Sequence, residues 1–147
     1  TASLEADIVG WDWFSLQLSD QTELMLYLIR EENGKINAAS SGTFIDQSGG
    51  ARHLTREDFK VTATDQWKSP RSGAVYPVAW RLKIAPLAID LNVVANLNNQ
   101  EMITTASTGV IYWEGSVSAS GTAAQQSVKA DGYVELTGYA EALRDPL

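Results

Sequence analysis

The chain has 147 residues, the length of a single domain, and its 44% hydrophobic and 20% charged residues are typical of a globular protein. Its formal net charge of -7 repels nucleic-acid phosphates and anionic lipid surfaces, so no nucleic-acid partner is expected. The lack of cysteine excludes disulfides, thiolate zinc sites and cysteine nucleophiles. The sequence also contains no apolar run of about eighteen residues and no signal-peptide pattern, so no membrane span is predicted.

The first predicted strand covers residues 10–18, where side chains alternate with a period of two. Trp11 and Trp13 fall on one side of this strand, and Asp12 falls on the other side together with apolar residues. A short polar break separates it from residues 22–30, where leucines alternate with other residues. The two runs predict an antiparallel hairpin.

Later strands are predicted where the same alternation, or a run of β-forming residues, lies between turn residues. They cover residues 39–46, 59–64, 78–84, 89–94, 110–119 and 132–138. Residues 54–59 are less regular, and the small polar residues of 116–127 predict a mobile hairpin. About nine short strands, with little room for helix, predict a single all-β domain with an antiparallel barrel or sandwich over residues 1–147.

Six segments carry a family resemblance in their order along the chain. They are Gly-Trp-Asp-Trp-Phe-Ser-Leu-Gln-Leu at 10–18, Thr-Glu-Leu-Met-Leu-Tyr at 22–27, Trp-Lys-Ser-Pro at 67–70, Tyr-Pro-Val at 76–78, Tyr-Trp-Glu-Gly at 112–115 and Gly-Tyr-Val-Glu-Leu-Thr-Gly-Tyr at 132–139. Together they resemble the carotenoid 1,2-hydratase and AttH-like secreted hydrolase family over nearly the whole chain. The resemblance implies an antiparallel lipocalin-like (calycin-type) β-barrel of about 8–10 strands.

The same resemblance implies a domain organisation. Family members have two β-domains in tandem, and these motifs belong to the C-terminal domain, so we expect the N-terminal domain of the same parent protein as a partner. An acidic, histidine-containing motif usually precedes the Gly-Trp-Asp-Trp-Phe strand in the family, and this chain, which begins at Thr1, lacks it. We therefore expect the isolated domain to be inactive.

The resemblance also implies an activity: water addition across a carbon–carbon double bond of a terpenoid, carotenoid or lipid-like substrate, or a related lyase or cyclase step. For many family members, hydrolase is only a label. An apolar small-molecule ligand and a periplasmic or secreted location are implied as well. The competing hypothesis is a non-enzymatic carrier of lipids or isoprenoids, or a structural domain, because a small β-barrel can enclose an apolar ligand without catalysis.

Three carboxylates are candidate catalytic acids, because hydrating an alkene requires a proton donor and aromatic faces that stabilise the resulting cation. Asp12 shares its strand face with apolar residues, and burial there would raise its pKa. Glu114 and Glu135 lie beside aromatic residues on strand-like segments. The alternatives are that Asp12 caps or pairs at the barrel rim, and that both glutamates lie on a solvated sheet face.

Six aromatic residues are candidates for binding the substrate. They are Trp11, Trp13, Tyr27, Trp80, Tyr112 and Trp113. The four tryptophans could enclose a polyene, but tryptophans at strand spacing also fill cores and domain interfaces. A filled interior beside exposed tryptophans would indicate a domain that docks on its partner, whereas a deep pocket would indicate a carrier.

The remaining polar residues suggest less chemistry. His53 lies in a turn-like stretch and is interpreted as an exposed loop residue. Arg30, Arg71 and Arg81 are interpreted as members of surface pairs rather than as a clamp for a carboxylate substrate. The carboxylates lack the spacing of a calcium loop, and one histidine cannot make a usual zinc site. Neither a metal nor a cofactor is predicted.

Overall fold

The computed structural model describes residues 8–104 and 109–140, which form ten β-strands and two single-turn helices. The strands are β1 (Ile8–Leu18), β2 (Glu23–Glu31), β3 (Ser41–Ile45), β4 (Ala51–Leu54), β5 (Phe59–Lys68), β6 (Val75–Ile84), β7 (Ile89–Ala95), β8 (Glu101–Thr104), β9 (Val110–Ala123) and β10 (Gln126–Leu136). The 3-10 helices are η1 (Arg56–Asp58) and η2 (Ala85–Leu87). No helix in the described part of the chain is long and apolar enough to cross a membrane.

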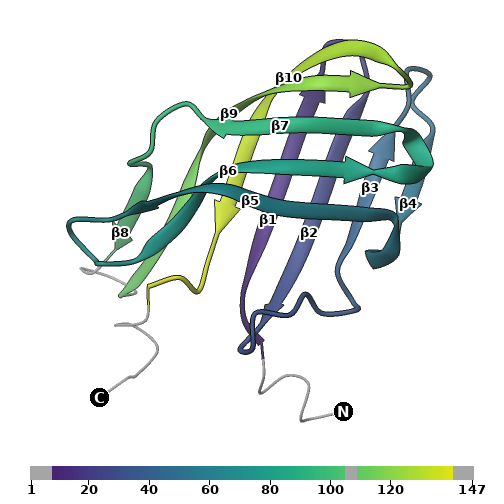
Figure 1. The fold of residues 1–147 in the computed structure, drawn as a ribbon. Coiled ribbons are helices and arrows are strands. Elements are labelled where there is room, and N and C mark those ends of the chain that lie inside the picture. The colour runs from purple at the N-terminus through teal and green to yellow at the C-terminus, as the bar shows by residue number, and fades with distance from the viewer. Residues whose placement is uncertain (1–7, 105–108, 141–147) are drawn as a thin grey trace.

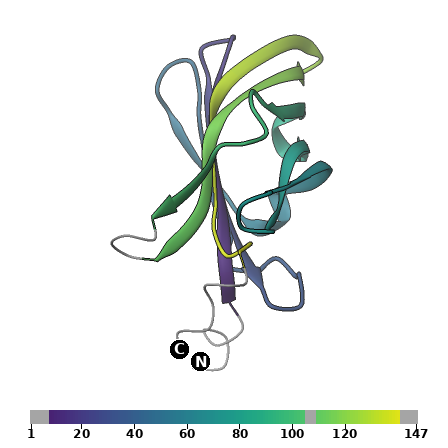
Figure 2. The same cartoon turned by 90° about the vertical axis from the view of Figure 1, so that its left-hand side faces the viewer.

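All the strands join one antiparallel sheet with the order β4-β3-β2-β1-β10-β9-β7-β6-β5, while β8 pairs with β9 outside this path. The sheet curves so strongly that β5, β6 and β7 cross over β1, β2 and β3 (Figure 1), and Figure 2 shows these layers from the side. It does not close, because β4 and β5 are its two end strands. The predicted all-β, antiparallel, lipocalin-like fold is therefore confirmed, with a strongly curved sheet in place of a closed barrel.

The core lies between the two halves of the curved sheet. Alternation along each long strand turns one face inward, so that Phe14 and Leu16 of β1 are buried. The Phe14 ring meets the Trp80 ring nearly edge-on, with ring centres 5.3 Å apart, and Trp80 meets Trp113 at 6.5 Å. The largest fully buried side chains are those of Trp80, Trp113, Tyr76, Phe14, Leu16, Leu24, Leu26, Leu54, Leu82, Ile84, Leu91 and Leu136. The core is thus built from side chains of several strands.

The predicted strands are present, and the structure adds two short ones. The β1–β2 hairpin forms, with Trp13 opposite Tyr27. Strands β4 and β8 are not predicted from the sequence, because each has only four residues and lacks clear alternation. Residues 116–127 form the ends of β9 and β10, and the turn between them has positive φ at Ala124 (47°) and Gln125 (68°). This turn lacks the Asn-Gly signal that usually marks such hairpins.

Close backbone contact between β1 and β10 gives a first test of the fold. A Cβ atom on Gly132 of β10 would lie 1.9 Å from the carbonyl oxygen of Ser15 on β1, so no side chain fits there. We expect Gly132→Ala to lower the free energy of unfolding by about 1–3 kcal/mol, the usual effect of overpacking. Urea denaturation measures the change, with Ser127→Ala at the exposed start of β10 as the control. Equal stability of both variants and the wild type would contradict this packing.

Candidate functional site

A buried carboxyl group lies where the start of β1 pairs with the end of β10. Asp12 faces the interior because it alternates with the outward-facing Trp11 and Trp13, and only 7% of it is exposed. The Nε atom of Arg30 donates to Oδ1 of Asp12 at 3.0 Å. The Tyr139 hydroxyl donates to the two carboxyl oxygens at 2.9 and 3.0 Å. We call Asp12, Arg30 and Tyr139 the Asp12 site.

Two glycines allow these groups to meet. A Cβ atom on Gly10 would lie 2.8 Å from Nη2 of Arg30, so the glycine leaves room for the guanidinium group, which also donates to a backbone carbonyl just after β10. Gly138 has a φ of 79°, a conformation that favours glycine, and it turns the chain after β10 so that Tyr139 reaches Asp12. The first and last segments of the family resemblance therefore meet in one site.

Burial dominates the electrostatics of the Asp12 site. It raises the pKa of Asp12, whereas the charge of Arg30 and the hydrogen bonds from Tyr139 and Arg30 lower it, and the net shift is upward. Burial and the neighbouring Asp12 charge raise the pKa of Tyr139, so its hydroxyl remains a neutral donor. The guanidinium carbon of Arg30 also lies 3.8 Å from the centre of the Tyr139 ring, a cation–π contact. Asp12 therefore keeps its proton to a higher pH than an exposed aspartate does.

A second polar cluster is centred on Glu101, the first residue of β8. Its carboxylate accepts hydrogen bonds from the hydroxyls of Ser69 at 2.5 Å, Ser72 at 2.6 Å and Tyr76 at 2.7 Å. Desolvation raises the pKa of Glu101, but the three hydrogen bonds and the charge of Arg71 together outweigh it and hold the pKa below its usual value. We call Glu101, Ser69, Ser72 and Tyr76 the Glu101 clamp. It ties β6 and the loop that precedes β6 to β8.

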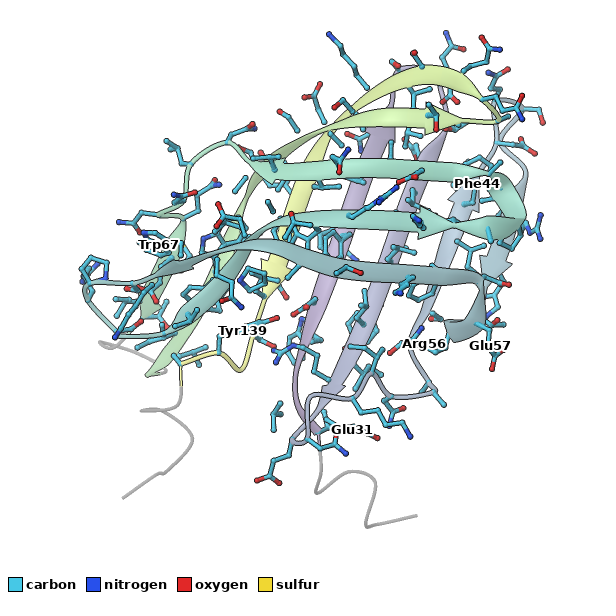
Figure 3. The ribbon with its side chains drawn as sticks, in the orientation of Figure 1. Glu31, Phe44, Arg56, Glu57, Trp67 and Tyr139 are labelled. Atoms are coloured by element: carbon cyan, nitrogen blue, oxygen red, sulfur yellow. The ribbon has the colours of Figure 1, made fainter. Side chains whose placement is uncertain are left out.

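Aromatic rings join the two clusters. The ring centres of Tyr76 and Tyr139 lie 5.6 Å apart, and Trp67 stacks against Tyr76 with ring centres 6.3 Å apart and an angle of 18°. Figure 3 labels Trp67 on β5 and Tyr139 just beyond the end of β10. Burial, followed by the hydrogen bond and charge of Glu101, raises the pKa of Tyr76, so its hydroxyl also stays neutral. Tyr76 thus contacts both polar clusters, through its hydroxyl on one side and its ring on the other.

The two predicted glutamates lie on the outer face of the sheet. Glu135 and Glu114 are opposite each other in the pairing of β10 with β9, and Trp11 donates its Nε1 hydrogen to Glu135 at 2.8 Å. Glu114 is exposed, and Tyr112 is half-buried on the same face. The structure therefore does not bring the three predicted acids together. Both glutamates lie on the solvated face of the sheet, as the alternative interpretation of the sequence predicts. Asp12 is buried and forms an ion pair with Arg30.

The four predicted tryptophans do not form a single box. Trp11 is 38% exposed and Trp13 is half-buried, and both face outward beside Tyr27, whose ring centre lies 6.4 Å from that of Trp11. Trp80 and Trp113 lie in the core, with 1% and 0% exposure. Strand alternation separates the two pairs, because it sends Trp11 and Trp13 to one face of the sheet and Trp80 and Trp113 to the other.

Sequence reasoning missed most partners of Asp12. The predicted surface pair for Arg30 is wrong, since its side chain is only 15% exposed and pairs with a buried carboxylate. The prediction for Arg81 is confirmed, because it forms an exposed ion pair at 2.8 Å. Tyr139 ends one of the segments that carry the resemblance, a signal that could have identified it. Glu101 follows a polar segment that offers no such signal.

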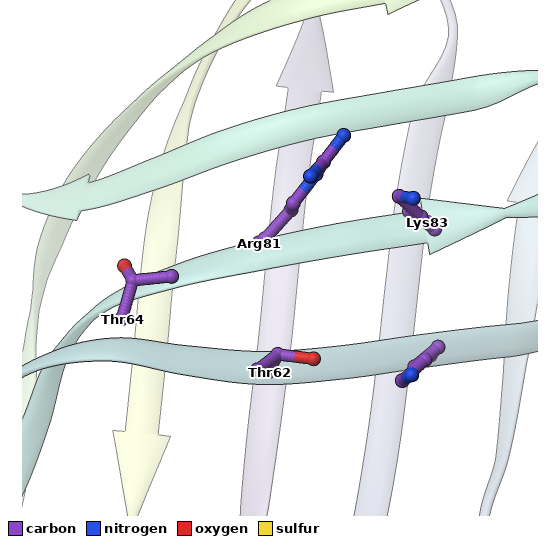
Figure 4. A pocket seen from close by; sticks show the side chains of 5 residues that line it. Thr62, Thr64, Arg81 and Lys83 are labelled. Carbon is purple, nitrogen blue, oxygen red and sulfur yellow. The ribbon is translucent and has the colours of Figure 1, made fainter.

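A groove on the outer face of β5 and β6 is separate from the Asp12 site. Its side chains alternate with inward-facing residues of β6, so the groove lies on the solvent side of the sheet. The Arg81 guanidinium in it already donates two hydrogen bonds to Asp90, at 3.1 and 2.8 Å. The groove therefore offers neither an acid nor an aromatic ring for the predicted chemistry. It is lined by Lys60, Thr62, Thr64, Arg81 and Lys83 (Figure 4).

Side chains that bind metals do not gather in the described residues. No group of three or more His, Asp or Glu side chains that could hold a metal ion is found in residues 8–104 and 109–140. His53 is exposed, as predicted, but it lies on strand β4, where it pairs with Thr43 of β3, and not in the predicted loop. The two polar clusters are built from carboxyl, guanidinium and hydroxyl groups.

A strongly curved antiparallel sheet of ten strands around a hydrophobic core places the described residues among lipocalin-like β-domains. The chain belongs to the AttH-like family, whose model matches residues 1–139. The solved structure of a protein described as AttH, from Nitrosomonas europaea, is similar, with 34% sequence identity and a TM-score of 0.80. The structure of kievitone hydratase from Nectria haematococca is similar in fold alone, with 18% identity and a TM-score of 0.74.

The matched regions are only part of each solved structure. They cover 91% of this chain and 40% of the AttH chain, and 92% of this chain and 41% of the kievitone hydratase chain. A comparison with curated proteins found no match. The predicted resemblance to the AttH-like family is thus confirmed, and this chain spans about two fifths of each of these structures.

Proposed function

We propose that this domain carries the acid of a hydratase-like active site that adds water across a carbon–carbon double bond of an apolar terpenoid, carotenoid or lipid-like substrate. Asp12 is the observation that carries the proposal, because it is a buried carboxyl group with a raised pKa beside the Tyr139 ring. Membership of the AttH-like family supports it, as does the shared fold with one hydratase.

The Asp12 site has the proton donor that such a reaction requires. Asp12 in its acid form transfers its proton to one alkene carbon, and positive charge develops on the other carbon. The Tyr139 ring already packs against the guanidinium group of Arg30 on one side and the Tyr76 ring on the other, so the aromatic faces that stabilise this charge belong to the rest of the proposed active protein. Arg30 and Tyr139 stabilise the carboxylate left behind, because both already point hydrogens at it. Water then adds to the cation and returns a proton to Asp12.

The proposed active protein includes the N-terminal β-domain of the same parent. This chain spans 40% of the AttH structure, and its outer face exposes a group of large apolar side chains. Their strand register places them on one face of β1, β2 and β10. We expect the N-terminal domain to pack on this face, and a periplasmic or secreted location belongs to the same proposal. The exposed side chains are those of Trp11, Met25, Tyr27 and Tyr133.

A non-enzymatic carrier of lipids or isoprenoids has less support. Such a carrier needs a deep apolar cavity that encloses its ligand. Here Phe14, Trp80 and Trp113 are fully buried inside the sheet, and the Trp80 ring contacts both of the others. Large aromatic side chains packed in the core, beside an exposed tryptophan, support a domain that docks on a partner.

Labelled water tests the proposed function. The full-length parent and the isolated chain are each incubated with lycopene and with geraniol in water labelled with heavy oxygen, and the products are analysed by mass spectrometry. We expect one labelled hydroxyl group in the product of the parent and no detectable label with the isolated chain. A parent that hydrates neither probe, or an isolated chain as active as the parent, would contradict the proposal.

A further inference from the structure

We propose that Glu101 is a positioning residue of the Asp12 site, which acts through the packed rings of Tyr76 and Tyr139. This inference rests on the acid role proposed for Asp12 and extends it to a second carboxylate. Glu101 does not touch Asp12. Its influence passes through the hydrogen bond from the Tyr76 hydroxyl to Glu101 and the contact between the Tyr76 and Tyr139 rings. It reaches Asp12 through the hydrogen bond from Tyr139.

The hydrogen-bond directions in the Glu101 clamp are fixed. The Ser69 hydroxyl oxygen accepts from the backbone N–H groups of Arg71 at 3.2 Å and Ser72 at 3.1 Å. The Ser72 hydroxyl oxygen accepts from the backbone N–H of Ala74 at 3.1 Å. Both hydroxyl hydrogens therefore remain for Glu101, which must accept all the bonds it makes in the clamp. An amide side chain at this position would present donors where only acceptors fit.

The clamp fixes Tyr76 because two of its three donors, Ser69 and Tyr76, are buried. Ser69 is 2% exposed and Tyr76 is 0% exposed, so neither hydroxyl can turn to bulk water if Glu101 is replaced. An unpaired buried hydroxyl is unfavourable by about 1–3 kcal/mol, which is enough to move a side chain toward another partner. The position of the Tyr76 ring therefore depends on the carboxylate.

Tyr76 in turn supports Tyr139. The Tyr139 ring lies between the guanidinium group of Arg30, 3.8 Å from its centre, and the Tyr76 ring, 5.6 Å from its centre. Its hydroxyl donates to Asp12. If the Tyr76 ring is displaced, the Tyr139 ring loses its packing on one side. The hydrogen bond from Tyr139 to Asp12 then weakens.

The positioning role and a simple charge effect predict opposite shifts in the pKa of Asp12. Loss of the negative charge of Glu101, by itself, would make it easier to ionise Asp12 and would lower its pKa. Loss of the hydrogen bond from Tyr139 would raise the pKa, because that bond favours the carboxylate. Arg30 faces Asp12 in both cases and keeps its charge. The sign of the shift therefore distinguishes the two effects.

A carbon-13 NMR titration of the aspartate carboxyl groups in this chain measures the shift, with Asp12→Asn used to assign the signal. Glu101→Gln is expected to raise the pKa of Asp12 by about half a unit or more. Tyr76→Phe should also raise the pKa of Asp12, without a change of charge. Tyr139→Phe should raise it most, because it removes the hydrogen bond to Asp12. The matched control is Asp131→Asn, which removes one exposed carboxylate on β10 and should leave the pKa unchanged.

Three results would overturn the positioning role. They are a lowered or unchanged pKa in Glu101→Gln, an unchanged pKa in Tyr76→Phe, and an unchanged pKa in Tyr139→Phe. If Glu101→Gln does not fold, the pKa of Asp12 in Tyr76→Phe tests the positioning role, because this variant keeps the aromatic ring and every charge. The titration requires no substrate, so a negative hydration assay would reject the proposed function without changing the result for Glu101.

Discussion

Asp12→Asn in the full-length parent is expected to slow alkene hydration by about 100- to 10,000-fold, the usual contribution of a general acid. Asparagine has nearly the same size and shape, but it cannot transfer a proton as a carboxylic acid does. Because the proposed reaction uses the protonated form of Asp12, the wild-type rate should also fall as the pH rises through the raised pKa of this group. The rate of label incorporation from heavy-oxygen water, followed against pH, measures both effects.

The control for this experiment is Asp131→Asn in the same parent. It makes the same chemical change on an exposed position of β10 and should retain the wild-type rate. Circular dichroism checks that both variants keep their β-structure. Full activity of Asp12→Asn would assign the acid to another residue and would contradict the proposed mechanism.

The largest effect on stability is expected when Asp12 loses its cationic partner. Arg30→Met keeps a long, flexible side chain but leaves a buried carboxylate without its counter-charge. Breaking a buried ion pair in this way lowers the free energy of unfolding by about 3–5 kcal/mol. The pKa of folded Asp12, already raised, rises further, so the stability lost at neutral pH should be recovered as the pH falls and the carboxyl group takes up a proton. Urea unfolding at several pH values measures the loss and its recovery.

Arg81→Met provides the matched control for Arg30→Met. It breaks an ion pair whose side chains are 50% and 39% exposed, so only a small change in stability is expected. The double variant Arg30→Met with Asp12→Asn should recover part of the stability, because no unpaired charge remains. Equal losses for Arg30→Met and Arg81→Met would contradict the importance of burial for the Asp12 pair.

The fold could be predicted because alternation is strong in the long strands. Leu24, Leu26 and Leu28 occupy every second position of β2, and all three are buried. Strands β4 and β8 are too short to show a period. The curvature of the sheet depends on contacts between strands that are distant in sequence. The alternation of residues within one strand gives no information about such contacts.

The candidate site could be predicted only in part. Asp12 was identifiable because it interrupts an apolar strand face. Its partners were not, since Arg30 reaches it through the register of β1 with β2, and Tyr139 lies 127 positions further along the chain. One sequence indicates where strands lie but gives little information about their register. The inward face of β9 was also ambiguous, because small residues occupy both sides of that strand.

The open sheet leaves β4 and β5 as edge strands, and exposed edges are templates on which other chains can pair and aggregate. Both edges have features that oppose such pairing. Strand β4 has only four residues and exposes Arg52 and His53. Strand β5 changes register between Ala63 and Gln66 and carries the exposed cation Lys60. A sheet that curves without closing therefore remains protected against edge-to-edge aggregation by short length, charge and bulging.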